Sequence, residues 1–206
     1  MAPRSREVGE AARSASRARI LAAARALFAE RGFFACKVAD IARRAGMSPG
    51  NVYWHFDSKE AILRAILADG FEAVETMTAD VAAAYGPARR KLDLLVERTL
   101  ALYDGNAEFA VILGGLMGHG GQELIRSLGF DMQEIGGRYH ANLRRVFAEA
   151  RAEGAVVTAA DPDLLVAFYL ALFNGLLITY ADLWPALPRD VLRDAVLRLV
   201  GYRPVS

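Results

Sequence analysis

Apolar residues recur along this chain with the spacing of an α-helix. In one short segment Val38, Ile41, Ala42 and Ala45 follow the i, i+3, i+4, i+7 pattern that places apolar side chains on one helical face. No stretch shows the sustained alternation of apolar and polar residues that is typical of a β-strand. Ala, Leu, Arg and Glu dominate the long segments. The pattern therefore predicts an all-α fold.

Breaks in this pattern divide the chain into nine expected helices. Gly32 and Gly46 are suited to end the first two, because glycine readily adopts the left-handed conformation of a C-cap. Ser48 is suited to the N-cap of the third helix, with Pro49 as its first residue. The expected helices cover about residues 16–31, 38–45, 49–56, 57 to the Gly86-Pro87 break, 88–103, 106–117, 131–153, 162–183 and 188–201.

The run Asp57-Ser58-Lys59-Glu60 has the D-x-x-E form of a capping box, with Asp57 at the N-cap and Glu60 at the third position. Lys59 would then sit at the second position, where the positive end of the helix disfavours a cation. A lysine beside exposed N–H groups is well placed to hold a phosphate. A solvated lysine is the alternative.

Charge divides the chain unevenly. Residues 1–60 hold 11 Lys/Arg against 6 Asp/Glu, a net of +5, and residues 61–206 hold 14 against 18, a net of −4. This asymmetry suggests that only the first part meets a polyanion, although chance clustering of solvated arginines would give the same count. We expect a flexible basic tail over residues 1–15, a small helical domain over 16–60 and a larger one over 61–206.

Several classes of protein find little support in the composition. The single cysteine, Cys36, permits no internal disulfide and no thiol cluster for zinc. The N-terminus lacks the apolar segment of a secretory signal. The most apolar run, residues 164–178, is shorter than the roughly 20 residues that a bilayer requires. We therefore expect a cytoplasmic protein that does not meet the membrane.

Catalytic signatures are also missing from the sequence. It contains no G-x-S-x-G, no P-loop lysine and no G-x-G-x-x-G after a strand. His55, His119 and His140 lie far apart, without the H-E-x-x-H spacing of a zinc site. We expect no enzyme, no metal and no cofactor. A helical interaction module that does not bind DNA is the third class, and affinity for duplex DNA that falls steeply with salt would separate these classes.

The helices expected over residues 38–45 and 49–56 are separated by a turn that contains Gly46, which is the helix-turn-helix arrangement. That arrangement places its second helix in the DNA major groove. At 100° per residue, Val52 and Phe56 face the core, Met47 and His55 lie near the boundary, and Gly50, Asn51, Tyr53 and Trp54 project outward. The two outward aromatics are suited to sugars and thymine methyl groups, and asparagine to adenine. Alternatively, the aromatics fold back onto the first or fourth helix as ordinary core residues.

Residues 32–63, GFFACKVADIARRAGMSPGNVYWHFDSKEAIL, resemble the DNA-binding domain of the TetR family of bacterial transcriptional regulators. The family pattern is V-x-x-I-A-x-x-A-G-V-S-x-G-x-x-Y-x-H-F-x-S-K-E-x-L after a Gly-aromatic pair. The matching residues are Val38, Ile41, Ala42, Ala45, Gly46, Ser48, Gly50, Tyr53, His55, Phe56, Ser58, Lys59 and Glu60. The resemblance is close only in this N-terminal part, and the rest of the chain fits the family in outline.

The resemblance implies phosphate contacts from Tyr53, His55 and Lys59, and contacts with base edges from the region of Pro49, Gly50 and Asn51. The chain departs from the family at three positions, since residues 36 and 37 are usually Thr or Ser there and residue 51 is often Thr. Cysteine caps a helix poorly, so we expect Lys37 to take the phosphate contact. The expected DNA-binding set is Lys37, Ser48, Pro49, Gly50, Asn51, Tyr53, Trp54, His55 and Lys59.

The resemblance also implies ligand binding and dimerisation by the C-terminal domain. The helix over 162–183 is apolar nearly all round, and the helix over 188–201 has a broad apolar stripe. Paired with their copies in a second chain, they would form the four-helix interface of the family, and a monomer core is the alternative. Asn142 and Tyr139 fall on the inward stripe of their helix, where they could bind a ligand or satisfy core hydrogen bonds. His119 lies in a glycine-rich joint, where an ordinary surface histidine is the alternative.

The expected ligand-binding residues are Phe109, Leu113, Met117, His119, Tyr139, Asn142, Phe168 and Leu172. No cluster of charged residues accompanies them, so we expect a largely apolar ligand. The complete expectation is a ligand-responsive transcriptional regulator that binds a palindromic operator as a homodimer. As the family implies, it would be a repressor that a small effector releases from DNA.

Overall fold

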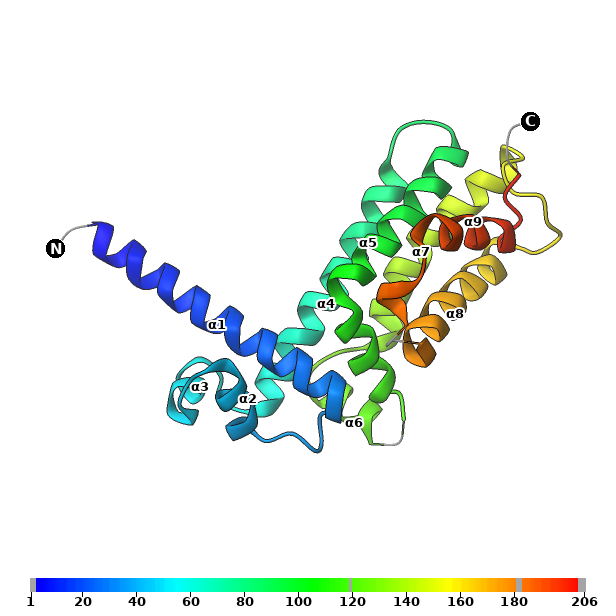
Figure 1. Ribbon diagram of the computed structural model, residues 1–206. Helices are drawn as coiled ribbons and strands as arrows, with labels where there is room; N and C mark the ends of the chain where they lie inside the picture. The colour runs from blue at the N-terminus through cyan, green and yellow to red at the C-terminus, as the bar shows by residue number, and fades with distance from the viewer. Residues whose placement is uncertain (1–2, 119, 181–182, 204–206) are drawn as a thin grey trace.

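The computed structural model describes the backbone of residues 3–118, 120–180 and 183–203, and the described chain is helical nearly throughout (Figure 1). An isolated antiparallel bridge joins Val156 to Tyr202. The helices are α1 (Pro3–Arg31), α2 (Val38–Ala45), α3 (Pro49–His55), α4 (Lys59–Ala83), α5 (Ala88–Gly115), α6 (Gly121–Ser127), α7 (Met132–Ala152), α8 (Pro162–Tyr180), the 3₁₀ turn η1 (Trp184–Ala186) and α9 (Arg189–Leu199). The all-α prediction is confirmed.

The structure differs from the prediction at the first helix and in the glycine-rich joint. The first helix begins at Pro3 and not near Ser16, so residues 3–15 of the expected flexible tail are helical. Alanine, arginine and glutamate in this stretch are strong helix formers, and no proline interrupts them after Pro3. The glycine-rich joint, expected to be irregular, contains α6.

The two helices expected over 88–103 and 106–117 form one helix, α5, with a kink at Asn106. Asn106 has φ −141° and ψ 28°, outside the helical region. Its side-chain amide donates a hydrogen bond of 3.2 Å to the Leu102 carbonyl, one turn earlier. The predicted break is therefore real as a bend, but it does not end the helix.

Two groups of buried side chains hold the molecule together. The first joins α1, α2 and α3 to the N-terminal half of α4, and it continues into the ends of α5 and α7 that lie nearest to them. The second joins the C-terminal half of α4 to α5, α7, α8 and α9. Helix α4 contributes to both, and Figure 1 shows it leading from the α1–α3 group into the bundle. Any movement of α4 is therefore shared by the two parts of the chain.

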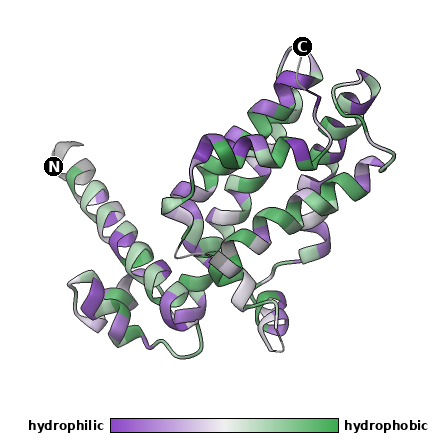
Figure 2. Cartoon of the chain, turned by 45° about the vertical axis from the view of Figure 1, so that its right-hand side comes forward, coloured by the Kyte–Doolittle hydropathy of each residue, from purple (hydrophilic) through white to green (hydrophobic). Residues whose placement is uncertain are grey.

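Helices α8 and α9 carry apolar residues on more than one face. On α8, Leu165, Val166 and Phe173 are buried, whereas Leu164 and Phe168 are 44% and 58% exposed. Figure 2 shows apolar colour along most of α8. On α9, Val196 is buried while Val191 and Leu199 are 59% and 70% exposed. In the part of the chain that the structure describes, no helix is both long enough and apolar enough to span a bilayer.

Candidate nucleic-acid interface and ligand cavity

The turn between α2 and α3 fixes the direction of α3. Gly46 has φ 65° and ψ 41°, the left-handed conformation that glycine adopts without a steric penalty, and it ends α2. The Ser48 hydroxyl then accepts a hydrogen bond of 3.2 Å from the Asn51 N–H, so Ser48 is the N-cap of α3 as predicted. Pro49 is the first helical residue, where its missing N–H leaves no bond unmade.

Helix α3 has one buried and one exposed face. Val52 is fully buried and Phe56, just after the helix, is 7% exposed. Tyr53 and Trp54 are 53% and 62% exposed, and Gly50 and Asn51 are exposed as well. The division of faces predicted from the sequence is confirmed, and the alternative in which both aromatics enter the core is wrong. The exposed face offers an amide and two aromatic rings to a partner.

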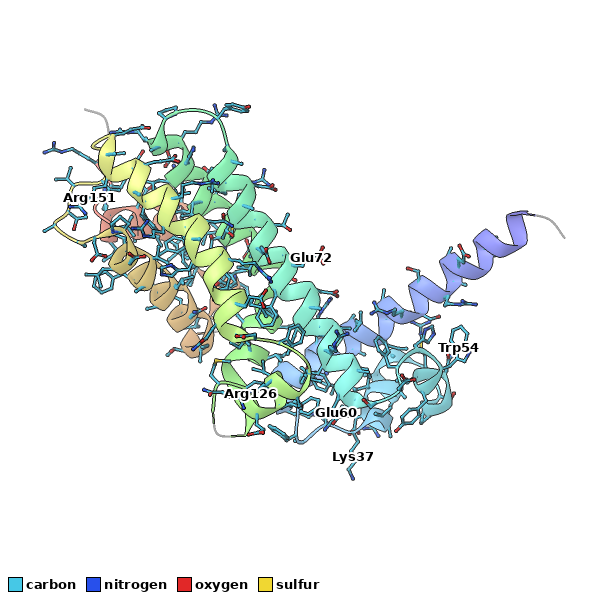
Figure 3. The ribbon with its side chains drawn as sticks, turned by 180° about the vertical axis from the view of Figure 1, so that it is seen from behind. Lys37, Trp54, Glu60, Glu72, Arg126 and Arg151 are labelled. Carbon is cyan, nitrogen blue, oxygen red and sulfur yellow. The ribbon has the colours of Figure 1, made fainter. Side chains whose placement is uncertain are left out.

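Trp54 contacts α1, through the part of that helix that was expected to be tail (Figure 3). The Arg13 guanidinium carbon lies 5.0 Å from the centroid of the Trp54 ring, and one turn later Arg17 lies 5.1 Å from the ring of Phe56. On its other side Trp54 meets His55 edge to face, with ring centroids 4.7 Å apart. Arg13 is thus a residue of this surface that we did not predict, because its place depends on α1 extending past residue 16.

Lys59 is the first residue of α4, whereas the sequence predicted it at the second position of that helix. The N-cap of α4 is Ser58, whose hydroxyl accepts a bond of 3.1 Å from the Ala61 N–H, so the predicted capping box on Asp57 is wrong. Ser58 has extended dihedral angles, and the helix begins at Lys59. The Lys59 ammonium donates hydrogen bonds of 2.9 Å to the carbonyls of Phe33 and Cys36, and lies 4.2 Å from the centroid of the Phe33 ring. Lys59 therefore holds the loop between α1 and α2.

Lys37 is the N-cap residue of α2, and its side chain points into solvent (Figure 3). Its backbone N–H donates to the Asp40 carboxylate at 3.2 Å, and this bond lowers the pKa of Asp40. Cys36 is buried and its thiol donates to the Leu27 carbonyl at 3.4 Å; burial raises the pKa of the thiol. Cys36 is thus a core residue, and Lys37 is free to face a phosphate.

Phe34 extends the exposed surface near Lys37. It is 66% exposed, whereas the adjacent Phe33 is buried and contacts it edge to face. The sequence signal was the Gly-Phe-Phe run, in which only one of two adjacent rings can face the core. The exposure of Phe34 was not among our predictions.

A cavity of about 210 Å³ lies among α4, α5, α7 and α8. Its lining residues are Phe71, Val74, Tyr103, Phe109, Ala110, Leu113, Gly114, Met117, Met132, Tyr139, Leu170, Asn174 and Ile178. Four of the expected ligand-binding residues, Phe109, Leu113, Met117 and Tyr139, are brought together here. None of these described lining residues carries a formal charge.

Three of the other expected ligand-binding residues, Asn142, Phe168 and Leu172, do not line this cavity. The Asn142 amide donates a hydrogen bond of 3.4 Å to the Thr78 hydroxyl. Asn142 therefore makes a core hydrogen bond, which was the alternative to binding a ligand. Phe168 projects from the outer face of α8, and Leu172 packs, half buried, against the second core group. His119 lies outside the described residues. Periodicity gave the correct helices for Asn142, Phe168 and Leu172 but could not tell the cavity side of a helix from its other sides.

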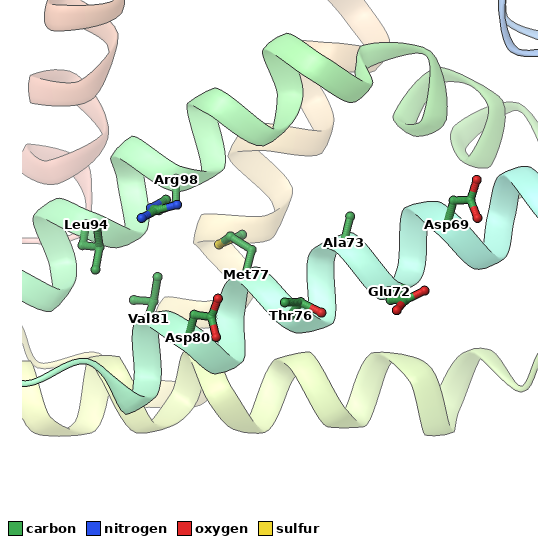
Figure 4. Close-up of a pocket in the computed structure, with 9 residues that line it drawn as sticks. All are labelled: Asp69, Glu72, Ala73, Thr76, Met77, Asp80, Val81, Leu94 and Arg98. Carbon is green, nitrogen blue, oxygen red and sulfur yellow. The ribbon is translucent and has the colours of Figure 1, made fainter. Parts of the chain in front are cut away.

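A larger hollow of about 580 Å³ follows the surface between α4 and α5 (Figure 4). Asp69, Glu72 and Asp80 project from α4 around it, and Arg98 comes from α5. These four side chains are exposed, and Asp69 is paired with Arg25 at 2.9 Å. Since water reaches its charged groups, this groove can exclude little solvent from a small ligand. The smaller, apolar cavity is the better candidate.

The N-terminal domain matches a known family. Residues 20–66 fit the sequence profile described as "Bacterial regulatory proteins, tetR family". This region includes α2, α3 and residues 32–63, which carry the resemblance described above. The helix-turn-helix part of the chain is therefore similar to this family.

Curated relatives agree with this assignment over part of their length. The chain is 46% identical over 52 residues to the HTH-type transcriptional regulator UidR of Escherichia coli (strain K12), covering 25% of this chain and 26% of the relative. It is 35% identical over 94 residues to the HTH-type transcriptional repressor KstR2 of Rhodococcus jostii (strain RHA1), covering 46% of each. These alignments span less than half of the relatives. Both relatives are named as regulators of transcription, which agrees with the expectation that the chain is not an enzyme.

Solved structures resemble the chain over nearly its whole length. The MbdR regulator from Azoarcus sp. CIB has a TM-score of 0.75 at 22% identity, covering 92% of this chain and 100% of that one. FadR from Bacillus subtilis, solved in complex with stearoyl-CoA, has a TM-score of 0.66 at 24% identity, covering 89% and 96%. At this identity the likeness establishes the fold, a helix-turn-helix domain followed by a helical domain.

Proposed function

We propose that this chain is a transcriptional repressor that binds a palindromic operator as a homodimer and is released by a small, largely apolar effector. The observation that carries the proposal is the presentation of α3. The helix is anchored by Val52 and capped by Ser48, and it offers Asn51, Tyr53 and Trp54 to solvent. Such a helix fits the major groove of DNA.

Each exposed group at this surface has a proposed partner on DNA. The N-terminal turn of α3, from Pro49 to Asn51, meets base edges, with the Asn51 amide suited to the paired donor and acceptor of adenine. Lys37 supplies a cation for a phosphate, and the exposed Tyr53 hydroxyl supplies a donor. Arg13, stacked on Trp54, places a further guanidinium at the edge of the same surface.

Dimerisation is supported by the outer faces of α8 and α9. Leu164 and Phe168 on α8, with Val191 and Leu199 on α9, leave four large apolar side chains in solvent within the described chain. A second copy would cover them with its own α8 and α9, forming a four-helix interface. A helix-turn-helix dimer reads two half-sites about 34 Å apart, so the operator is expected to be palindromic.

The effector acts through α4 in this proposal. Phe71 and Val74 of α4 line the cavity, while Lys59 at the start of the same helix holds the α1–α2 loop. A ligand that favours a different position of these walls favours a different position of α4. In a dimer this changes the separation of the two copies of α3, which then no longer match the half-sites.

Selection of binding sites from a random duplex DNA library tests the DNA-binding part. We expect the full chain to enrich a palindrome, with an affinity that falls steeply as salt rises. Asn51→Ala should change discrimination at particular base pairs, because its amide reads a base edge. Equal losses on all sequences would exclude that role. An absence of enrichment, with weak binding that does not depend on salt, would contradict the proposed function.

A further inference from the structure

The cavity among α4, α5, α7 and α8 has walls suited to a ring. Phe71 and Phe109 meet edge to face, with centroids 5.4 Å apart, and both line the cavity. Met117 and Met132 add thioethers, which adapt to irregular shapes and make favourable contacts with aromatic rings. Because no lining residue in the described part of the chain is charged, a carboxylate or phosphate inside the cavity would find no counter-ion among these walls.

The volume of the cavity limits the size of its ligand. A cavity of about 150 Å³ holds benzene, and sites for drug-sized ligands begin at about 300 Å³. At about 210 Å³, this cavity lies between these sizes. It accommodates one six-membered ring with a short substituent, and it is too small for a long acyl chain.

Two hydroxyl groups supply a polar anchor within the apolar walls. Tyr103 of α5 and Tyr139 of α7 both line the cavity, and neither hydroxyl makes a hydrogen bond with another described residue. Burial raises the pKa of Tyr103 to about 12, with a further contribution from Tyr139, and burial raises the pKa of Tyr139 as well. Both phenols therefore stay protonated at neutral pH and present O–H donors to a bound molecule.

We infer that the cavity binds an uncharged molecule built on one six-membered ring, with a short apolar substituent and one oxygen that hydrogen-bonds to Tyr103 or Tyr139. A ligand oxygen that accepts from either phenol makes a hydrogen bond that the described protein leaves unmade. This inference names the class of effector and rests on the proposed function only for the consequence on DNA. Binding itself can be measured on the protein alone.

Titration calorimetry on the full chain with four probes tests the ligand class. 4-Propylphenol has the ring and the oxygen, propylbenzene lacks the oxygen, and 4-propylbenzoate and decanoate are anions at neutral pH. We expect 4-propylphenol to bind about tenfold more tightly than propylbenzene, the effect of one hydrogen bond. The two anions should bind more weakly than both. Tighter binding of decanoate or 4-propylbenzoate than of 4-propylphenol would overturn the inference.

Conservative tyrosine variants test the anchor. Tyr103→Phe and Tyr139→Phe keep the ring and remove the hydroxyl, so we expect propylbenzene to bind as before and at least one variant to lose most of the preference for 4-propylphenol. Tyr85→Phe is the matched control, because Tyr85 is 97% exposed and does not line the cavity. Unchanged propylbenzene binding shows that a variant is folded. Full retention of the preference in both cavity variants would exclude the two tyrosines as the anchor.

Adding 4-propylphenol to the complex of the full chain with its selected DNA separates the two proposals. Binding of 4-propylphenol to the free protein without release of DNA supports the ligand class and contradicts its role as effector. Selective DNA binding by a protein that binds none of the four probes upholds the regulator and overturns the ligand class.

Discussion

At the scale of single residues, two lysines near the proposed DNA-binding surface illustrate how similar side chains acquire different roles. Lys37 is exposed at the N-cap of α2. Lys59 is partly buried and its ammonium is bound by two backbone carbonyls. An ammonium has three donors, so Lys59 keeps at most one N–H for a phosphate while it holds the α1–α2 loop.

This difference predicts opposite outcomes for two alanine variants. Lys59→Ala should lower the free energy of unfolding by about 2 kcal/mol, because two carbonyls lose a charged donor. Lys37→Ala should leave stability unchanged and reduce the salt slope of DNA binding by about one. Urea denaturation and titrations of labelled operator at several salt concentrations measure the two effects. Equal stability of the two variants would contradict the structural role of Lys59.

At the scale of helices, one close contact between α4 and α5 depends on a glycine. A Cβ atom on Gly70 would lie 2.2 Å from Cδ2 of Phe109, and Phe109 is a wall of the cavity. The ring could escape such a contact only by moving toward the cavity or by separating the helices. The packing of α4 on α5 and the shape of the cavity are thus linked at one contact.

Gly70→Ala should therefore destabilise the chain by about 1–3 kcal/mol, the usual effect of overpacking, and weaken ligand binding in the cavity. Gly105→Ala is the control, since nothing lies within 4 Å of a Cβ built there and alanine favours the helix by up to about 1 kcal/mol. Thermal denaturation and calorimetry with propylbenzene would measure both effects. Unimpaired stability and binding in Gly70→Ala would show that Phe109 has room that we do not expect.

A second contact between elements joins α5 to η1 and α9 and depends on pH. The Asp104 carboxylate accepts hydrogen bonds from Arg189 at 2.6 Å and from the Trp184 indole at 2.9 Å. The hydrogen bond from Arg189 makes the largest contribution to lowering the pKa of Asp104 below its usual value, and the bond from Trp184 makes a smaller one. A carboxylate whose folded-state pKa is depressed contributes stability above its unfolded pKa of about 3.9, and loses it as pH falls through the folded value.

Asp104→Asn should therefore lower the free energy of unfolding at pH 7, by about 1 kcal/mol, because the side chain is 46% exposed and solvent screens it. The gap between the variant and the unmodified chain should narrow as pH falls below about 4. Thermal denaturation between pH 7 and pH 3 checks this dependence. Asp80→Asn is the control, since the described structure records no hydrogen bond to Asp80. A gap that stays constant with pH would exclude the ionic contribution.

The sequence predicted the helices better than it predicted which face of each helix contacts a neighbouring helix or lines the cavity. Val38, Ile41 and Ala42 gave the bounds of α2, because helical period, cap and C-terminal glycine all agree there. The kink at Asn106 was read as a helix end, since a local sequence cannot show that α5 continues across it. Trp54 was placed outward correctly, but its contact with Arg13 joins residues 41 positions apart and depends on tertiary structure.

The same limit applies to the cavity. Tyr139 was predicted and Tyr103 was not, although both line it, because the two residues lie on different helices and only packing brings them together. Asn142 shares the inward stripe of α7 with Tyr139, yet it bonds to Thr78. Periodicity assigns a residue to the inside of a bundle, whereas the space that a ligand can occupy depends on how all four helices fit.

At the scale of the whole molecule, the exposed apolar side chains of α8 and α9 indicate what the isolated chain lacks. Their inner faces complete the second core group, so the outer faces are not needed to fold the chain. Phe168 is 58% exposed and Leu199 is 70% exposed. Apolar patches of this kind mark protein interfaces, and covering them with a second copy would place two copies of α3 on one face of DNA.

Phe168→Glu should therefore weaken the proposed dimer without unfolding the chain. The proposed interface would bury two copies of this ring, at about 1.5–3 kcal/mol each, so we expect the dissociation constant to rise by at least about a hundredfold. Sedimentation velocity over a range of concentrations measures this shift. Tyr85→Glu, in which a 97% exposed aromatic outside α8 and α9 is replaced, should remain dimeric.

The DNA affinity of the same variant connects the interface to α3. A weakened dimer should lose affinity for a palindrome and keep its weaker affinity for a single half-site, because the contacts of one α3 are unchanged. If Phe168→Glu instead stays dimeric, and binds the palindrome as tightly as the unmodified chain, the outer face of α8 is not the interface. A variant that is monomeric and still binds the palindrome fully would show that the two helices read DNA without being joined through α8 and α9.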